Sequence, residues 1–204
     1  MNAKKIVTAG LALVMVAGIS VAGTLAYLTS TTGEVKNTFT VGSISMELKE
    51  EKVTKADGVW TEGTDLVTEN RYENIYPGAE LPKTPVVTIK AGSEPCYVYV
   101  CVENPFDAES VAVTYNEDWS AIETSGDKTV YKYKEIVDAN SADVVLTGAP
   151  MTQVTISEDV TDMTDLAGDI KVTAYAHQAK ANGDDLTTTA DAGALEHFGI
   201  SVAG

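Results

Sequence analysis

Histidine and cysteine are scarce in this chain of 204 residues, which contains two of each. Two cysteines are too few for a disulfide-dense scaffold, and two histidines leave little material for a histidine-rich metal site or a histidine-based relay. Positive charge is also scarce, because 14 Lys and Arg face 30 Asp and Glu, for a formal net charge of -16. This charge excludes DNA or RNA as a partner. The 44% of hydrophobic residues is nevertheless enough to build a core.

The N-terminal segment has the pattern of an export signal. Lys4 and Lys5 are followed by no charged residue before Glu34, and the stretch from Ile6 to Val21 is apolar. A charged start followed by an apolar run is typical of a secretory signal, which predicts an N-terminal signal helix. The protein is therefore expected to be secreted, in an extracellular matrix or at the cell surface.

Small residues around positions 23–26 predict where the signal is cut. We expect cleavage after Ala26, so that Tyr27 begins the mature chain, and cleavage after Ala22 is the alternative. An uncleaved segment is long enough to anchor the chain in a membrane, which is the one membrane contact that we expect. With either outcome the rest of the chain lies outside the cell.

The remainder of the chain alternates apolar and polar residues with a period of two, which predicts β-strands. A glycine at position 42 shifts this alternation and predicts a bulge. Residues 49–74 are polar and are expected to form a long excursion, and Thr189–Phe198 is the best helix candidate, with Thr189 as its cap. The predicted strands are Phe39–Leu48, Val86–Lys90, Cys96–Glu103, Val111–Tyr115, Thr129–Ile136, Val144–Leu146, Gln153–Ser157 and Ile170–Gln178.

Many short strands separated by turns predict an all-β fold, an antiparallel β-sandwich of jelly-roll type with a short C-terminal helix. The turn signals include Pro77-Gly78, which is typical of a type II turn. The expected organisation is a signal peptide at 1–26, an extended segment at 27–41 and one sandwich domain at 42–204.

Cys96 and Cys101 are predicted to remain unpaired with each other. They stand at the two ends of one predicted strand, where their Cα atoms would lie about 16 Å apart and their side chains on opposite faces. Cys96 shares its face with valines and is expected to be buried. Cys101 shares its face with Tyr97 and Tyr99, and it is the candidate reactive thiol, with an intermolecular disulfide as the alternative to simple burial.

The motifs of common hydrolases do not occur in this sequence. His177 and His197 are twenty residues apart with no H-E-x-x-H, no serine lies in a G-x-S-x-G elbow, and the histidines are expected at the surface or rim. Residues 81–85, Leu-Pro-Lys-Thr-Pro, differ from a cell-wall sorting signal because Pro85 stands where glycine is required, so we interpret them as a loop. We expect no enzymatic activity and no cofactor.

Two sets of residues leave a binding function open. Calcium is an alternative to a solvated acidic face for one set, and stacking on sugars is an alternative to core packing for the other. The acidic set is Glu158, Asp159, Asp162, Asp165 and Asp169, and the aromatic set is Tyr97, Tyr99, Tyr131, Tyr133, Tyr175, Trp60 and Trp119.

Several segments taken in order resemble the TasA/camelysin family of exported proteins. The resemblance lies in Gly23–Ser30 (GTLAYLTS), followed by Asn37–Gly42 (NTFTVG) and an alternating strand. It continues through Tyr76–Gly78, although Ala79 replaces the acidic residue of the family, and ends with Ile170–Ala179 (IKVTAYAHQA).

This resemblance implies a jelly-roll domain, processing by a SipW-type signal peptidase and a role as a structural subunit of biofilm-matrix fibres. Copies of the chain would join head to tail, each supplying a strand to the next. The expected donor-strand residues are Tyr27, Leu28, Val35, Phe39 and Val41. A surface adhesin or glycan-binding module is one alternative, and a camelysin-like metalloprotease is another.

Overall fold

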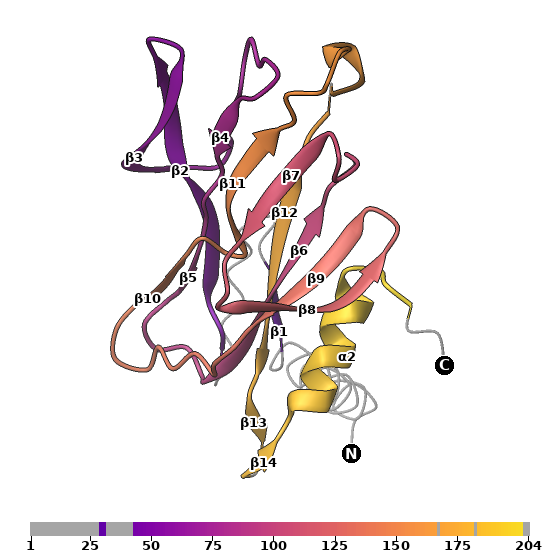
Figure 1. Cartoon of the computed structure of the whole chain (residues 1–204). Coiled ribbons are helices and arrows are strands. Elements are labelled where there is room, and N and C mark those ends of the chain that lie inside the picture. The colour runs from indigo at the N-terminus through magenta and orange to yellow at the C-terminus, as the bar shows by residue number, and fades with distance from the viewer. Residues whose placement is uncertain (1–28, 32–42, 167, 182, 202–204) are drawn as a thin grey trace, which may run out of the picture.

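The computed structural model describes residues 29–31, 43–166, 168–181 and 183–201. These residues form antiparallel β-sheets and one α-helix near the C-terminal end (Figure 1). The prediction of an all-β fold with a short C-terminal helix is confirmed. The expected signal helix and the bulge at position 42 lie outside the described residues.

The first sheet contains five strands in the order β1-β12-β6-β9-β8. All its neighbouring strands run antiparallel, and β12 and β6 pair along eight positions. Its strands are β1 (Thr29–Thr31), β12 (Lys171–Gln178), β6 (Cys96–Glu103), β9 (Lys128–Tyr133) and β8 (Trp119–Ser125).

Three further sheets complete the strands of the described residues. The second has the order β10-β5-β2-β3, the third β4-β11-β7, and the fourth is the pair β13-β14. Their bounds are β10 (Val144–Thr147), β5 (Pro85–Ile89), β2 (Met46–Ala56), β3 (Val59–Val67), β4 (Glu80–Pro82), β11 (Met151–Ile156), β7 (Val111–Tyr115), β13 (Lys180–Ala181) and β14 (Asp184–Asp185).

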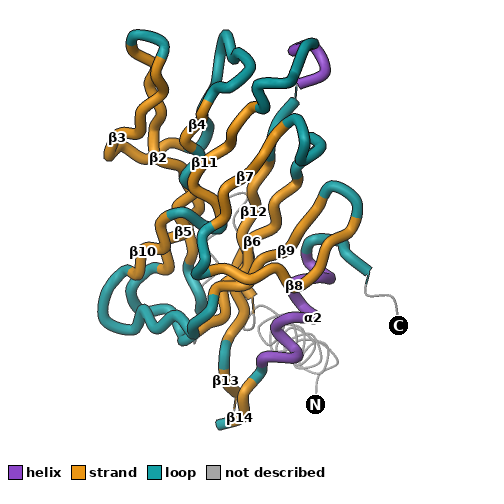
Figure 2. Tube along the Cα trace, in the orientation of Figure 1, coloured by secondary structure: helices purple, strands orange, loops and turns teal. Residues whose placement is uncertain are grey.

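Several strands were not predicted: the long β3 and β8, and the short β1, β4, β13 and β14. The polar segment expected as an irregular excursion instead forms most of the long hairpin β2–β3, and β8 follows the same pattern of an exposed, polar strand. The tip of this hairpin, the loop before β4 and the short 3₁₀ helix η1 (Met163–Leu166) project from one end of the molecule, at the top of Figure 2. Strands β3 and β8 are stabilised mainly by pairing with their neighbours. Because few of their side chains are buried, their sequences lack the apolar alternation that predicts a strand.

The largest buried cluster joins the first and second sheets. It contains Val87 and Ile89 from β5 and Val98 and Val100 from β6, all of which are fully buried. Cys96 belongs to the same cluster, as its valine-rich face predicted. Strand β6 is buried on both faces, because a second cluster covers its other side.

Helix α2 (Thr187–His197) forms that second cover. It packs on the face of the first sheet that points away from the main core, and its Ala190, Ala194 and Leu195 are buried there (Figure 1). The helix begins two residues before the predicted start. The predicted cap at Thr189 was wrong, because the Asp185 carboxylate accepts the N–H of Thr187 at 2.7 Å and thus satisfies a donor at the helix start.

The turn predicted at Pro77-Gly78 is present. Gly78 has φ of +81°, and the N–H of Ala79 donates to the carbonyl of Tyr76 at 3.0 Å. A positive φ at the second central residue is what a type II turn requires, and glycine adopts it without a steric cost. The turn leads directly into β4 and the buried Leu81.

Candidate functional site

The candidate site is the outer edge of the first sheet, where β1 lies beside β12. The register pairs Thr29 with His177, Ser30 with Ala176 and Thr31 with Tyr175. Strand β12 is paired on its other side with β6 along its full length. The only described part of the leading segment therefore occupies an edge position rather than a central one.

The two faces of β12 meet different layers because side chains alternate along a strand. Ala174 and Ala176 point to the main core and are fully buried. Tyr175 is 3% exposed and belongs to the cluster under α2. His177 is also 3% exposed, and its Nδ1 lies 2.8 Å from the carbonyl oxygen of Gln178. The site is thus a strand edge between a core on one face and a helix on the other.

Helix α2 approaches β12 closely at Gly193. A Cβ atom at that position would lie 3.1 Å from the Tyr175 hydroxyl oxygen and 3.6 Å from Cδ2 of His177. One turn further, the ring of His197 stacks on Tyr175 with centroids 4.8 Å apart, and Phe198 meets Tyr175 edge-on at 6.2 Å. Glycine at position 193 is explained by this contact, since a larger residue would crowd the buried Tyr175.

Asp191 fastens the middle of α2 to the sheet. Its Oδ1 accepts hydrogen bonds from the hydroxyl of Tyr99 at 2.6 Å and from Nζ of Lys132 at 2.7 Å. Tyr99 is fully buried, and burial together with the hydrogen bond to Asp191 raises the pKa of its hydroxyl. Tyr99 is therefore neutral at ordinary pH and donates to the carboxylate.

Asp185 fastens the start of α2 in the same way. Its Oδ2 accepts the hydroxyl of Tyr97 at 2.7 Å, and its Oδ1 accepts the hydroxyl of Thr187 at 2.5 Å. Hydrogen bonds from Thr187 and then from Tyr97 lower the pKa of Asp185 to about 2. Lys132 lies over the Tyr97 ring at 4.3 Å and adds positive charge nearby. We call Tyr97, Tyr99, Lys132, Asp185, Thr187 and Asp191 the helix clasp.

The helix clasp was not predicted from the sequence. Tyr97 and Asp185 are 88 residues apart, and Tyr99 and Asp191 are 92 residues apart. The one sequence signal for it is the alternation of Tyr97 and Tyr99 on a strand, with the two aspartates Asp185 and Asp191 six residues apart near the candidate helix.

The predicted cleavage and donor-strand residues do not belong to this described geometry. They lie outside the described residues, and β1 covers only three positions of the expected donor segment. The positions concerned are Ala26 and Tyr27 for cleavage, and Tyr27, Leu28, Val35, Phe39 and Val41 for the donor strand.

Cys96 and Cys101 are not joined to each other, as predicted, and both are free thiols in this chain. Cys101 is 4% exposed and lies in the cluster beneath α2, together with Tyr99 and Val130. Burial raises the pKa of Cys101 to about 11 and that of Cys96 to about 12. A thiol with such a pKa is protonated at neutral pH, which disfavours reactivity at the candidate residue Cys101.

The expectation that both histidines lie at the surface was wrong for His177, which is buried under α2. The expectation is confirmed for His197, which is exposed. The part of its ring that packs against neighbours is shielded from water, and this lowers the pKa of His197. Both rings lie near Tyr175, at centroid distances of 6.4 Å and 4.8 Å. Within the described residues, no group of three or more His, Cys, Asp or Glu side chains is arranged to hold a metal ion.

The aromatic side chains considered for sugar binding are mostly part of the core. Five of them are buried, which favours core packing over stacking on a ligand; they are Tyr97, Tyr99, Trp119, Tyr131 and Tyr175. Trp60 and Tyr133 are partly buried, with Trp60 against the ring of Tyr72 at 5.2 Å and Tyr133 against Trp119 at 5.2 Å.

The acidic series considered for calcium has a local structural role at one position. The Oδ1 atom of Asp162 accepts the N–H of Thr164 at 2.9 Å and its hydroxyl at 2.6 Å, which shapes the turn of η1. These hydrogen bonds lower the pKa of Asp162. The carboxylate of Asp162 therefore accepts hydrogen bonds from its own chain, two residues further on.

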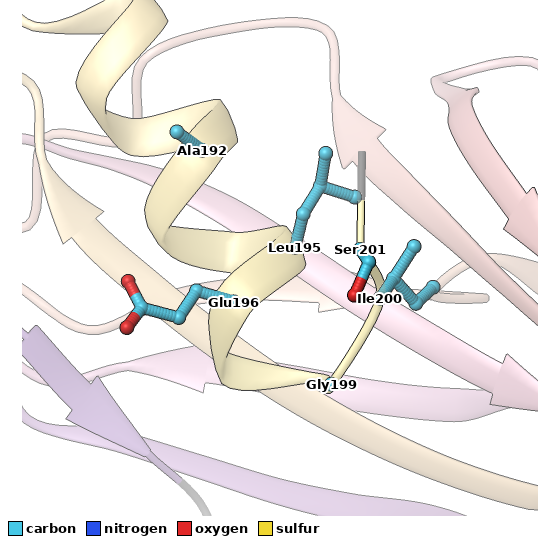
Figure 3. A pocket seen from close by; sticks show the side chains of 6 residues that line it. All are labelled: Ala192, Leu195, Glu196, Gly199, Ile200 and Ser201. Carbon is cyan, nitrogen blue, oxygen red and sulfur yellow. The ribbon is translucent and has the colours of Figure 1, made fainter. Parts of the chain in front are cut away.

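A shallow depression of about 370 Å³ lies at the C-terminal end of α2 (Figure 3). In this view Glu196 points to the opposite side of the helix end from Ile200. The residues that line the depression are Ala192, Leu195, Glu196, Gly199, Ile200 and Ser201. Among these described residues there is one carboxylate on a largely apolar surface, which is unlike the convergent polar groups of a small-molecule site.

Comparison of the chain with protein-family models, with curated proteins and with solved structures gave no match. In the part of the chain that the structure describes, no helix has the length and hydrophobicity needed to cross a membrane.

Proposed function

We propose that this chain is a secreted structural subunit of extracellular, biofilm-matrix fibres, with a domain of jelly-roll type. Each subunit would supply its leading segment as a strand to the first sheet of the next subunit. The observation that carries this proposal is the position of β1, which adds to the outer edge of that sheet beside β12.

The pairing of β1 with β12 uses an interaction that can be exchanged between copies. Strand pairing at an edge is made by backbone hydrogen bonds, so the same bonds form whether the strand belongs to the same chain or to a neighbour. A segment that leaves one domain and enters the next makes a contact between two different surfaces. Such a head-to-tail contact continues into an open filament instead of closing as a dimer.

The rest of the domain supports β12 as an acceptor. Its opposite edge is fixed by eight paired positions of β6, its Ala174 and Ala176 face lies on the main core, and its Tyr175 face lies under α2. Removal of β1 would therefore change one edge while the faces of the strand stay covered. An edge that presents unpaired backbone groups is a template for a strand from another chain.

Deletion of residues 27–36 from the mature protein tests the proposal. We expect the deleted protein to remain monomeric by sedimentation and to form no fibres by negative-stain microscopy, in physiological salt, where the Debye length is about 8 Å. A synthetic peptide of residues 27–41 should bind the deleted protein, and a scrambled peptide should not. Fibres as abundant as those of the undeleted protein would refute the strand-addition mechanism, and a monomer under all salt and pH conditions would favour an adhesin.

Disulfide trapping distinguishes exchange from pairing within one chain. Ser30 and Ala176 are register partners, so the double variant Ser30→Cys, Ala176→Cys places two thiols at adjacent strand positions. Oxidised fibres should dissolve in detergent as a ladder of covalently linked subunits. The single variant Ser30→Cys is the matched control and should give no ladder. Linked monomers alone, recovered from genuine fibres, would show that β1 stays in its own chain.

A further inference from the structure

A lysine, a glutamate and an asparagine meet at the base of the β2–β3 hairpin. Glu50 lies on β2, where it pairs with Val67 of β3 and Pro85 of β5. The ammonium group of Lys83 forms an ion pair with Oε1 of Glu50, and the amide nitrogen of Asn70 donates to Oε2 at 3.1 Å. One carboxylate therefore holds an amine on one oxygen and an amide on the other.

The ion pair in this group is shielded from solvent. The Lys83 side chain is 10% exposed and that of Glu50 is 14% exposed, whereas the Lys90 side chain, which pairs with Asp143 and Glu47, is 39% exposed. The amine of Lys83 and the carboxylate of Glu50 are therefore held in contact with little access of water, whereas the amine of Lys90 is open to solvent.

The side chain of Asn70 is held in one orientation. The N–H of Val53 donates to its Oδ1 at 2.9 Å, and its nitrogen donates to the carbonyl oxygen of Glu51 at 2.7 Å as well as to Glu50. The backbone donor identifies which amide atom is the oxygen, since an amide nitrogen cannot accept it. The same donor polarises the amide carbonyl, as donors do when negative charge develops on a carbonyl oxygen under attack.

An aromatic pair covers the neighbouring segment. The hydroxyl of Tyr72 donates to the carbonyl oxygen of Pro82, next to Lys83, and its ring packs against Trp60 with centroids 5.2 Å apart. Burial, followed by the charges of Glu50 and Glu62, raises the pKa of Tyr72, so its hydroxyl stays neutral. Partly buried aromatic rings beside the ion pair limit the access of water to it.

We propose that this group is a self-modification site, at which Nζ of Lys83 and the side-chain amide of Asn70 form an intramolecular isopeptide bond. Glu50 accepts a proton from the ammonium, the free amine attacks Cγ of Asn70, and the new C–N bond forms as the bond from Cγ to Nδ2 breaks. Glu50 passes this proton to the departing nitrogen, which leaves as ammonia. The ammonia then takes up the proton that the attacking nitrogen loses as it becomes the new amide, and it is released as ammonium. Glu50 ends in its starting state, and no oxidant or other reactant is consumed.

This bond would join the segment after β3 to the connection between β4 and β5. The two free cysteines of the chain are buried and form no disulfide, so an amide bond would be a covalent constraint that does not depend on redox conditions. The loop it closes runs from residue 70 to residue 83 and includes the turn at Gly78.

The mass of the intact purified protein tests the proposal without any variant. We expect the wild-type chain to be lighter than its sequence by the mass of one ammonia molecule. Trypsin should then release residues 56–71 joined to residues 72–90, with no cleavage after Lys83. A wild-type chain of full sequence mass, with separate peptides and cleavage after Lys83 even after prolonged incubation, would overturn the proposal and leave an ion pair only.

Variants distinguish this bond from other losses of ammonia. Lys83→Ala, Asn70→Ala and Glu50→Gln should each have the full mass of their sequence, because each lacks the amine, the amide or the proton acceptor. Lys90→Ala is the matched control and should keep the deficit. An asparagine that cyclises on its own backbone also loses ammonia but does not need Lys83, so a deficit that persists in Lys83→Ala would overturn the proposal.

Discussion

Replacing Asp191 with alanine should destabilise the domain by loosening α2 from the first sheet. The substitution removes the acceptor of the Tyr99 hydroxyl, which is 2.6 Å away on a fully buried residue, and the partner of Lys132 at 2.7 Å. A buried hydroxyl left without a partner costs about 1–3 kcal/mol. The ion pair contributes less, about 0.2–1 kcal/mol, because the two side chains are 18% and 35% exposed.

The expected loss in the free energy of unfolding for Asp191→Ala is therefore about 1–4 kcal/mol. With a urea dependence of about 2 kcal/mol/M, this loss lowers the unfolding midpoint by about 0.6–2 M. Tyr99→Phe removes one partner without leaving a buried hydroxyl, so it should cost about 1 kcal/mol. The double variant should lose less free energy of unfolding than the sum of the two single losses, because both substitutions remove the same hydrogen bond.

Equilibrium unfolding in urea, followed by tryptophan fluorescence, provides the measurement. The control is Asp118→Ala, which breaks an equally short ion pair of 2.6 Å to Lys134 between side chains that are 45% and 49% exposed. This control should change the free energy of unfolding by no more than about 0.5 kcal/mol. A midpoint for Asp191→Ala as high as that of Asp118→Ala would show that the helix clasp does not hold α2.

Two further predictions concern pH and thiol chemistry. Because Asp185 has a pKa of about 2 in the folded chain, below its unfolded value of about 3.9, its contribution to stability is present above pH 4 or so and is lost as pH falls toward about 2. Asp185→Asn should flatten the acid side of a plot of unfolding midpoint against pH, and an unchanged acid limb would contradict this. Because burial raises the pKa of Cys101 to about 11 and of Cys96 to about 12, a thiol reagent at pH 8 should label neither cysteine until denaturant is added. Prompt labelling of Cys101 in the native protein would show that α2 leaves the sheet.

The strands that build the core were predictable from sequence, because their apolar side chains alternate or run continuously. The predicted ranges Cys96–Glu103 and Val111–Tyr115 coincide with β6 and β7. The division of β6 into a Cys96 face and a Cys101 face also follows from the period of two and is confirmed. Local pattern was sufficient wherever burial dictated the residue type.

Strands that lie mainly in solvent were not predictable in the same way. β3 consists largely of exposed residues, and its conformation is set by its pairing with β2. The burial of His177 was missed because the helix that covers it comes from a separate segment of chain. The groups around Glu50 were also missed. Residues 81–85 were interpreted as a loop, whereas Leu81 and Pro82 belong to β4, Pro85 begins β5, and Lys83 and Thr84 between them are buried. Contacts between distant segments decide these positions, and a periodic pattern does not encode them.

The fibre proposal and the isopeptide proposal depend on separate parts of the domain and can fail separately. Exchange of β1 requires an edge of the first sheet, whereas the Lys83 amine, the Glu50 carboxylate and the Asn70 amide lie around β2 and the strands beside it. Removal of residues 27–36 deletes none of these three side chains. The deleted protein should therefore lose its fibres and keep its mass deficit, while Lys83→Ala should regain its mass and still assemble. A covalent bond within the subunit would then stabilise the domain that the exchanged strand joins to its neighbours.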